Sequence, residues 1–315
     1  MRAAAILGLG CSLKSLQPFQ SDKGIEWRIG MPADSAQADV ILLFGGDGTV
    51  HRHLSQLVTL GLPVLVVPAG SGNDFARSLD LRSVRDSLAA WRKFCDGEAN
   101  VYAIDLGTIT PVITPGENAS GAPAPHEPDR YPAITTRYFC CVAGVGLDAE
   151  VSRRANRLPR WLRGHGGYAL SLLPTMFRFA PVETKVLTLD ADEKRLSAAA
   201  SNWITLSEQP TILAAFANTP TYGSGMKIAP RAKMDDGLLD ICVVGALNPL
   251  KLFCMFPTVY FGKHLQVREV KYLQTARVRL ETEIPLDVYA DGEFVCRTPV
   301  EICTHRAALR VIVRE

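Results

Sequence analysis

Two glycine-rich turns, each placed directly after a short apolar run, constrain the fold of this chain more than any other feature. The first turn follows the apolar residues 40–44 in "VILLFGGDGTV", and the second follows residues 64–67 in "VLVVPAGSGND". Uninterrupted apolar runs of this length are typical of strands buried on both faces of a parallel sheet. The turns lie roughly 25 residues apart, which suits a strand, helix and strand unit. The pattern predicts an α/β domain with both turns at one sheet edge.

The residue types in these turns indicate what the edge could bind. Gly45 and Gly46 let a ligand approach the main chain closely, Thr49 can cap the following helix, and Asp47 brings a carboxylate. One such turn could equally be a tight turn with an ordinary helix cap. Two aligned turns predict a cleft floored by backbone N–H groups, which is a common way to hold a polyphosphate.

Composition limits the protein class. With 315 residues and 47% hydrophobic content, the chain can bury a sizeable core, and its length favours two domains. A net charge of only +2 gives no whole-protein attraction to nucleic acid. No segment offers 18 uninterrupted apolar residues, so no membrane span is expected. The start "MRAAAILGLGCSL" is interpreted as a first strand, and the eight cysteines, without a C-x-x-C pair, as buried reduced thiols of a cytoplasmic protein.

The pattern of predicted secondary structure changes near residue 104. Residues 1–104 alternate between short strands, at 4–9, 25–29, 40–44 and 64–67, and helices, one of them near 84–94. Residues 105–304 are mainly strand-like and predict a β-sandwich, with a Pro- and Gly-rich surface loop at 111–130. Residues 305–315 are expected to complete the first domain.

One basic segment interrupts the strand-like half. Residues 151–179 contain six arginines and no Asp or Glu, interleaved with Leu, Trp and Tyr. Such an amphipathic element could lie on an anionic membrane surface. A helix pair packed on the sandwich with solvated arginines explains it equally well, and binding of nucleotide phosphates is a third alternative.

Five separated motifs together resemble the diacylglycerol kinase catalytic-domain family, which includes soluble bacterial lipid kinases, sphingosine kinases and ceramide kinases. The motifs are "GGDGT" at 45–49, "PAGSGNDFAR" at 68–77, "GVGLDAEV" at 144–151, "DDGLLD" at 235–240 and "DGE" at 291–293. The resemblance covers nearly the whole chain. It implies an N-terminal domain like that of NAD kinases and phosphofructokinases, a C-terminal β-sandwich, and ATP in the cleft between them.

The resemblance also implies roles for individual residues. The nucleotide would be held by Gly45, Gly46, Asp47, Gly48, Thr49, Ser71, Gly72 and Asn73, and Asp47 could reach a nucleotide-bound Mg²⁺. Asp291 would be the general base that accepts the proton of the lipid hydroxyl, with Glu293 as its partner or substitute. Taken alone, "DGE" would be an ordinary hairpin turn.

Two further acidic positions can be interpreted either as functional residues or as ordinary turn and helix-cap residues. The family places a structural Mg²⁺ at "KMDDGLLD", which implies Asp236 as ligand with Met234 and Leu238 as backbone donors. The alternative is a turn with solvated acids, although three crowded carboxylates favour a cation or an arginine nearby. Asp148 would orient the lipid head group, or would simply cap the next helix.

The chain departs from the family in two places. An Asn-Pro-x-Ser/Gly turn usually follows the first strand, whereas this chain has "GLGCSLK". After "GGDGT" and one further residue, the family commonly has Asn-Glu, whereas this chain has His51 and Arg52.

The sequence therefore predicts an ATP- and Mg²⁺-dependent lipid kinase that phosphorylates a hydroxyl of a diacylglycerol-like or sphingoid lipid. The alternatives are a soluble small-molecule kinase of the NAD kinase type and an inactive relative that binds nucleotide or lipid. The expected partners are a lipid substrate and, transiently, the membrane surface, with no nucleic acid and with a homodimer left open. The expected location is cytoplasmic, peripheral to the membrane.

Overall fold

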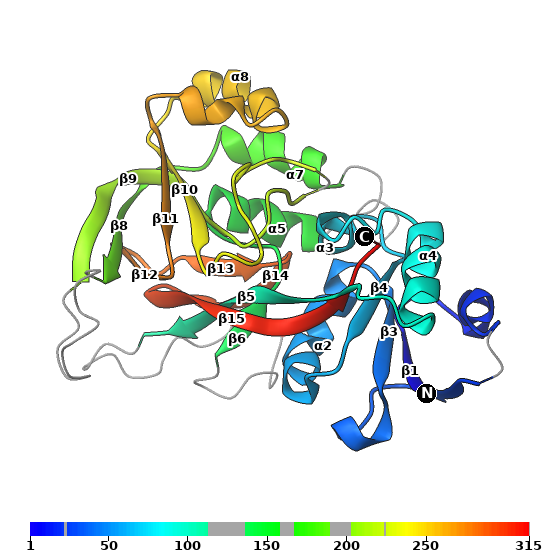
Figure 1. Ribbon diagram of the computed structural model, residues 1–315. Helices are drawn as coiled ribbons and strands as arrows, with labels where there is room; N and C mark the ends of the chain where they lie inside the picture. Colours follow the sequence, from blue (N-terminus) through cyan, green and yellow to red (C-terminus); the bar gives the residue numbers. More distant parts are fainter. Residues whose placement is uncertain (22–23, 113–135, 158–166, 190–202, 224, 315) are drawn as a thin grey trace.

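The computed structural model describes residues 1–21, 24–112, 136–157, 167–189, 203–223 and 225–314 (Figure 1). The strands in chain order are β1 (Arg2–Leu7), β2 (Glu26–Ile29), β3 (Val40–Gly45), β4 (Val64–Pro68), β5 (Val101–Pro111), β6 (Arg137–Phe139), β7 (Val142–Gly146), β8 (Val182–Leu189), β9 (Trp203–Ala217), β10 (Leu239–Gly245), β11 (Val270–Thr275), β12 (Arg277–Thr282), β13 (Asp287–Ala290), β14 (Glu293–Arg297) and β15 (Val300–Ile312). The helices are α1 (Leu13–Leu16), α2 (Asp47–Leu60), α3 (Asp74–Ser78), α4 (Val84–Cys95), α5 (Leu147–Arg157), α7 (Gly167–Met176) and α8 (Pro249–Val259), with short 3-10 helices η1 (Gln17–Phe19), η2 (Ser35–Gln37) and η4 (Lys263–Gln266).

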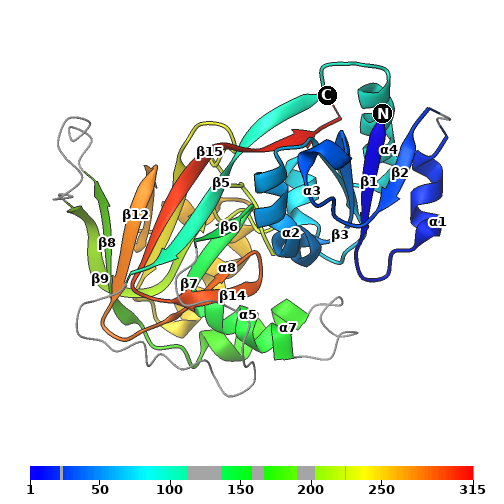
Figure 2. The same ribbon diagram turned by 90° about the horizontal axis from the view of Figure 1, so that it is seen from below.

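The N-terminal part is a parallel sheet in the order β2, β1, β3, β4. Every residue of β3 and β4 is buried, as expected of strands covered on both faces. Helices α2 and α4 lie on either side of this sheet (Figure 2). The Ser83 side chain caps α4 by accepting from the Asp86 amide at 3.2 Å, and α2 ends at Gly61 in the left-handed region. The predicted strands and helices of this region are confirmed.

The C-terminal part is mainly antiparallel. Its strands follow the order β14, β13, β7, β9, β8, β12, β15, with β10 and β11 next to β9 and with β5 and β6 next to β15. Val, Leu, Ile and Phe side chains from these strands form one buried apolar cluster of their own. A second, larger cluster joins the core of the parallel sheet to residues of α5, α7 and α8. Helices α5, α7 and α8 gather on one side of these strands (Figure 1). The predicted combination of an α/β part with a β-sandwich-like part is confirmed.

Strand β15 connects the two parts. Its first residues pair with β12, it runs antiparallel to β5 over most of its length, and Val311 near its end pairs in parallel with Val64 of β4. Leu309, Val311 and Ile312 accordingly belong to the core of the parallel sheet. The sheet that carries the glycine turns is therefore completed by residues close to the other end of the chain.

The two segments that the sequence singled out as irregular or basic are described only in part. From residue 113 on, the predicted loop at 111–130 lies outside the described residues, as do Arg160 and Arg163. The described part of the basic segment forms the end of α5 and all of α7. Arg153 and Arg154 both form ion pairs with Glu150, which offsets part of the segment's positive charge. Among the described residues, no helix is both long and apolar enough to cross a bilayer.

Candidate active site

The two glycine turns touch each other at the carboxyl edge of the parallel sheet. A Cβ at Gly46 would lie 2.8 Å from the Cα of Gly70, and a Cβ at Gly70 would lie 2.5 Å from the Cα of Gly46. The turn after β1 reaches the same edge, where the Gly8 amide donates to the Phe44 carbonyl at 2.7 Å. A Cβ at Gly45 would lie 2.5 Å from Thr49 Oγ1, so Thr49 fills the space under this turn. Glycine is thus required because the chain segments approach closer than any side chain permits.

Helix α2 begins inside the first glycine turn. Its N-cap is Gly46, and no side chain caps this end. The free amide N–H groups in the first turn of the helix, together with the helix dipole, therefore favour an anion at this position. A bare glycine cradle at the start of a 14-residue helix fits the close approach of a triphosphate.

Asp47 ties the two turns together. Its carboxylate accepts from the backbone amides of Asp74 and Phe75, at 3.1 Å each, and so caps helix α3. A Cβ at Gly72 would lie 2.8 Å from Asp47 Oδ2, which explains the glycine there. Burial, aided by the charges of Asp74 and Asp291, raises the pKa of Asp47 to about 6, although the two amide donors act in the opposite direction.

The remaining residues of the second turn have distinct environments. Asn73 has a left-handed backbone, with φ of 57°, and its side-chain amide bonds both the N–H and the carbonyl of Gly70, at 2.8 and 2.7 Å. Asn73 therefore holds the turn closed. Ser71 lies exposed at the tip of the turn.

Asp291 is buried beneath the start of β7. Its carboxylate accepts from the amides of Cys140, Cys141 and Val142, at 2.9, 2.8 and 3.3 Å. His51 of α2 approaches the same carboxylate, with Nδ1 3.3 Å from Oδ2. The side chain of Asp291 is 0% exposed, whereas that of His51 is 17% exposed, so His51 is the member of this pair that reaches solvent.

These donors set the ionisation of Asp291. Burial alone would raise its pKa, but the hydrogen bond and charge of His51 and the amide donors outweigh burial, so the pKa of Asp291 lies below its usual range. A carboxylate held in this way is ionised at neutral pH and is a weak proton acceptor by itself.

The "DGE" turn reaches across to the first glycine turn. Asp291 has a left-handed backbone, with φ of 50°, and Glu293 is exposed at the start of β14. A Cβ at Gly48 would lie 3.4 Å from Glu293 Oε1, which places this carboxylate beside the first turn of α2. The structure therefore brings Asp47, Gly48, Asp291 and Glu293 together.

The "KMDDGLLD" segment forms a tight loop before β10. Asp236 Oδ1 accepts from the Leu238 amide at 3.0 Å, and the Met234 carbonyl accepts from the Asp105 amide at 2.6 Å. The fully buried Asp240 carboxyl accepts from Tyr272 and Gln274 through Oδ1, while its Oδ2 has no hydrogen-bond partner among the described residues. Burial, and to a lesser extent the charge of Asp236, raises the pKa of Asp240. The candidate metal-ligand atoms of this loop are all oxygens, and one buried carboxylate oxygen beside it has no hydrogen-bond partner among the described residues. Both properties suit a hard cation such as Mg²⁺.

Asp105 is a site residue that the sequence analysis missed. From the middle of β5 its carboxylate accepts from the amides of Gly237 and Ala307, at 2.7 Å each, and so joins the acidic loop to β15. The available signal was an acid inside the otherwise apolar stretch "AIDLG", where a buried charge needs partners.

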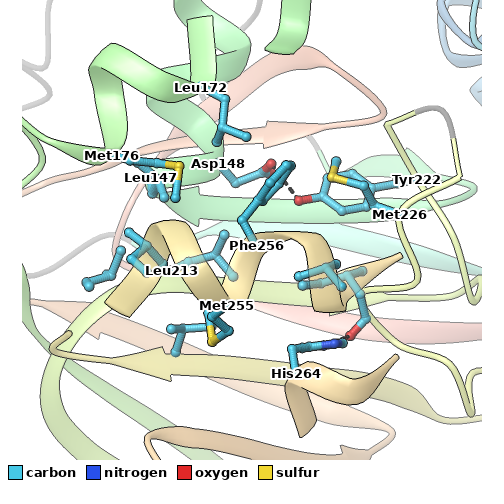
Figure 3. A pocket seen from close by; sticks show the side chains of 15 residues that line it. Leu147, Asp148, Leu172, Met176, Leu213, Tyr222, Met226, Met255, Phe256 and His264 are labelled. Atoms are coloured by element: carbon cyan, nitrogen blue, oxygen red, sulfur yellow. Dashed lines mark hydrogen bonds between the residues drawn. The ribbon is translucent and has the colours of Figure 1, made fainter. Parts of the chain in front are cut away.

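Asp148 lies in a different environment, at the wall of an apolar cavity (Figure 3). It occupies the first turn of α5, and Tyr222 donates to its Oδ1 at 2.8 Å. The cavity has a volume of about 50 Å³ and is lined by side chains of α5, α7, α8, β9 and β10, mostly Leu, Ile, Val and Met. His264, whose pKa is lowered by burial, also lines it and contacts the Ile228 carbonyl at 3.1 Å. Tyr222 was another residue that the sequence analysis missed.

Strand β7 contacts both the wall of the cavity and the buried carboxylate of Asp291. A Cβ at Gly144 would lie 1.9 Å from Asp148 Oδ2, so the Asp148 carboxylate lies directly over Gly144. The Val142 amide, two residues earlier, donates to Asp291 at 3.3 Å. Two residues of a strand span about 7 Å. The polar wall of the cavity therefore lies close to the buried carboxylate of Asp291.

The glycine turns, the start of α2 and the carboxylate turn of the antiparallel part all lie in segments that match a family of kinases. Residues 20–109 match the diacylglycerol kinase catalytic domain, and residues 141–313 match the YegS C-terminal NAD kinase beta sandwich-like domain. A diacylglycerol kinase of Mycobacterium tuberculosis is 33% identical over 274 residues, which cover 87% of this chain and 76% of that protein. The chain belongs to the diacylglycerol kinase family.

Solved structures share the fold across the whole chain. A diacylglycerol kinase from Bacillus anthracis superposes with a TM-score of 0.62 at 16% identity, covering 99% of this chain and 96% of the other. An NAD kinase from Archaeoglobus fulgidus, solved in complex with ATP, superposes with a TM-score of 0.52 at 13% identity, covering 100% of this chain and 94% of the other. The predicted likeness to NAD kinases is confirmed at the level of the fold.

Proposed function

We propose that this protein is an ATP-dependent lipid kinase, which transfers the γ-phosphoryl group to a hydroxyl of a diacylglycerol-like or sphingoid lipid. The observation that supports the proposal is the short distance along β7 between the wall of the apolar cavity, where Asp148 and Tyr222 lie, and Asp291 beside the glycine turns. A lipid hydroxyl next to Asp148 would direct its reactive oxygen toward Asp291, with the adjoining part of its chain at the cavity. Because the cavity has a volume of only about 50 Å³, it would have to open further to take an acyl chain. A soluble acceptor would have no use for such a cavity.

ATP is assigned to the glycine cradle. The touching turns of Gly46 and Gly70 and the uncapped start of α2 support the binding of its phosphates. Mg²⁺ would neutralise charge on the phosphates, and the loop of Met234, Asp236 and Leu238 would hold a second, structural ion. Ser71 and Glu293 lie exposed in the two turns that border the cradle.

In the transfer step, the lipid hydroxyl oxygen bonds to the γ-phosphorus while the bond from that phosphorus to the bridging oxygen breaks and ADP leaves. The hydroxyl proton goes to the His51–Asp291 pair. Asp291 is too enclosed to contact a substrate, whereas His51 is both in contact with it and accessible. A buried carboxylate that orients an imidazole and stabilises its cationic form is an effective proton-accepting unit.

The proposal is tested by transfer of labelled γ-phosphate from ATP to a panel of lipids in detergent micelles, with NAD as a soluble competitor. The wild type is expected to label one lipid class in a Mg²⁺-dependent way, and Asp291→Asn is expected to lose at least about 100-fold in kcat. Asp287→Asn is the matched control, because Asp287 lies in the same hairpin and forms a partly exposed ion pair with Arg297. Label entering NAD, or no label in any lipid, would overturn the assignment.

A further inference from the structure

We propose that the outer faces of α7 and α8, with the turn that follows α8, dock on an anionic phospholipid bilayer. The inference rests on the proposed function in one respect: the substrate is taken to reside in that bilayer. It adds the surface through which the protein would reach it.

Both helices are apolar on two opposite sides. Toward the interior, Leu172 and Met176 of α7 and Leu252, Met255 and Phe256 of α8 line the cavity (Figure 3). Large apolar side chains also face outward, and their exposed fractions are 46% for Leu173, 57% for Phe177, 68% for Leu250, 45% for Phe253 and 73% for Phe261. A helix that is apolar all round is expected in a protein core or against lipid, and these outer sides are not covered by the described chain.

The outward side chains form one surface. The rings of Phe177 and Phe253 lie 6.5 Å apart between centroids, which joins the end of α7 to the middle of α8. Tyr260, which is 42% exposed, packs edge to face on the cavity-lining Phe256 at 5.9 Å and extends the exposed aromatic surface to the end of α8. Figure 1 shows α8 at the top of the molecule and α7 below it, and the two helices are in contact.

The charged residues around this surface are basic, which favours an anionic partner. Residues 171–181 and 246–268 contain no Asp or Glu. The same stretches carry the exposed basic residues Arg178, Lys251, Lys263 and Arg268. Lys251 contacts the neighbouring Glu269 at 2.6 Å. An apolar centre with basic residues at its margin matches an anionic membrane surface, where aromatic side chains enter the interface and Lys and Arg meet the head groups.

The position of the cavity distinguishes a bilayer from a protein partner. The wall between the exposed apolar surface and the cavity consists of α7 and α8 themselves, so only these two helices would separate a docked bilayer from the cavity. A second copy of the chain on this surface would keep the bilayer away from the cavity.

The test measures binding to vesicles by co-sedimentation. Wild type is expected to bind vesicles of phosphatidylcholine with about 30% phosphatidylglycerol, and to bind less to pure phosphatidylcholine or in about 0.5 M NaCl. Phe253→Ser/Phe261→Ser should weaken binding at least about tenfold. Ile29→Ser/Ile284→Ser, at positions that are 51% and 54% exposed on other parts of the surface, is the matched control and should bind as wild type does.

Activity separates this inference from the proposed function. The double Phe variant should phosphorylate micellar lipid within about twofold of wild type but lose at least about tenfold on vesicles. Asp291→Asn, inactive in both assays, should still bind vesicles, so docking is measured even if the kinase assignment fails.

Three results would overturn the inference. Equal vesicle binding by wild type and the double Phe variant would exclude this surface, as would the absence of any preference for anionic vesicles. A wild-type dimer in sedimentation velocity that the double Phe variant converts to a monomer would assign the surface to a second copy of the chain.

Discussion

The site at the glycine turns and the apolar cavity are built in opposite ways. The glycine-turn site is made mostly of backbone: glycine turns that touch, a helix start without a side-chain cap, and carboxylates bound by amide groups. The cavity is lined mainly by Leu, Ile, Val and Met side chains from elements spread over residues 147–264. The glycine-turn site should therefore tolerate almost no substitution, whereas the cavity should respond gradually.

Under the proposed function, the difference follows from what each region would recognise. Phosphate groups have fixed geometry and charge, so amide donors must be held in fixed positions. Acyl chains are flexible and are recognised by apolar surface, whose contribution scales with buried area. The comparison predicts a ranking of mutational effects.

Gly46→Val should have the largest effect. Any side chain at this position would collide with Gly70, so the two turns must separate and the phosphate site is lost. We expect at least about a 1,000-fold loss of kcat/KM and no thermal shift on addition of ATP. Gly24→Ala, at a position where a Cβ meets nothing within 4 Å, is the control. ATP binding retained by Gly46→Val would show that the contact between the turns is dispensable.

His51→Ala should come second. We expect kcat to fall about 100-fold with little change in the KM for ATP, and added imidazole should restore part of the rate. Steady-state kinetics with and without imidazole provide the measurement. Full activity in His51→Asn would instead show that the side chain only hydrogen-bonds to Asp291, and would return the role of base to Asp291 itself.

Asp148→Asn should have an intermediate effect, about tenfold in kcat/KM for the lipid, because an interaction between a charged group and the lipid head group is lost. Tyr222→Phe removes only the hydroxyl that orients Asp148 and should cost severalfold. Both variants should keep the wild-type KM for ATP. A change in ATP affinity equal to the change for lipid would contradict the placement of Asp148 on the lipid side.

Met255→Ala should have the smallest effect on the rate. The enlarged cavity should shift the preference toward longer or bulkier acyl chains with less than about a fivefold change in kcat/KM, while the free energy of unfolding falls by about 2–4 kcal/mol. Chemical denaturation and a series of lipid chain lengths provide the measurements. An unchanged chain-length profile would indicate that the acyl chain binds elsewhere.

The sequence predicted the parts of the molecule that depend on local patterns. The buried strands β3 and β4, the two glycine turns and helix α4 all follow from patterns of apolar residues and glycines that are adjacent in the chain. The sequence also predicted that Asp236 and Asp291 lie in turns, because each is followed directly by a glycine.

The contacts that define each site could not be predicted in this way, because they join distant segments. Asp291 is bound by amides of residues 140–142, about 150 positions earlier, and Asp105 bonds Gly237 and Ala307. Nothing near Asp291 in the sequence indicates that its carboxylate is fully enclosed or that His51 would be its accessible neighbour. The sequence shows that His51 departs from the family pattern, but only the fold shows that His51 lies against Asp291.

Strand β15 has a consequence for biosynthesis. Its end contributes to the core of the parallel sheet and lies against β4, yet β15 is translated after every other strand described here. On the ribosome, the edge of β4 must therefore remain uncovered while nearly all of the chain is made, and pairings this distant in sequence form slowly. A nascent chain that stops before β15 should expose an apolar strand edge and bind chaperones, so the nucleotide cleft is expected to mature only after β15 has left the ribosome.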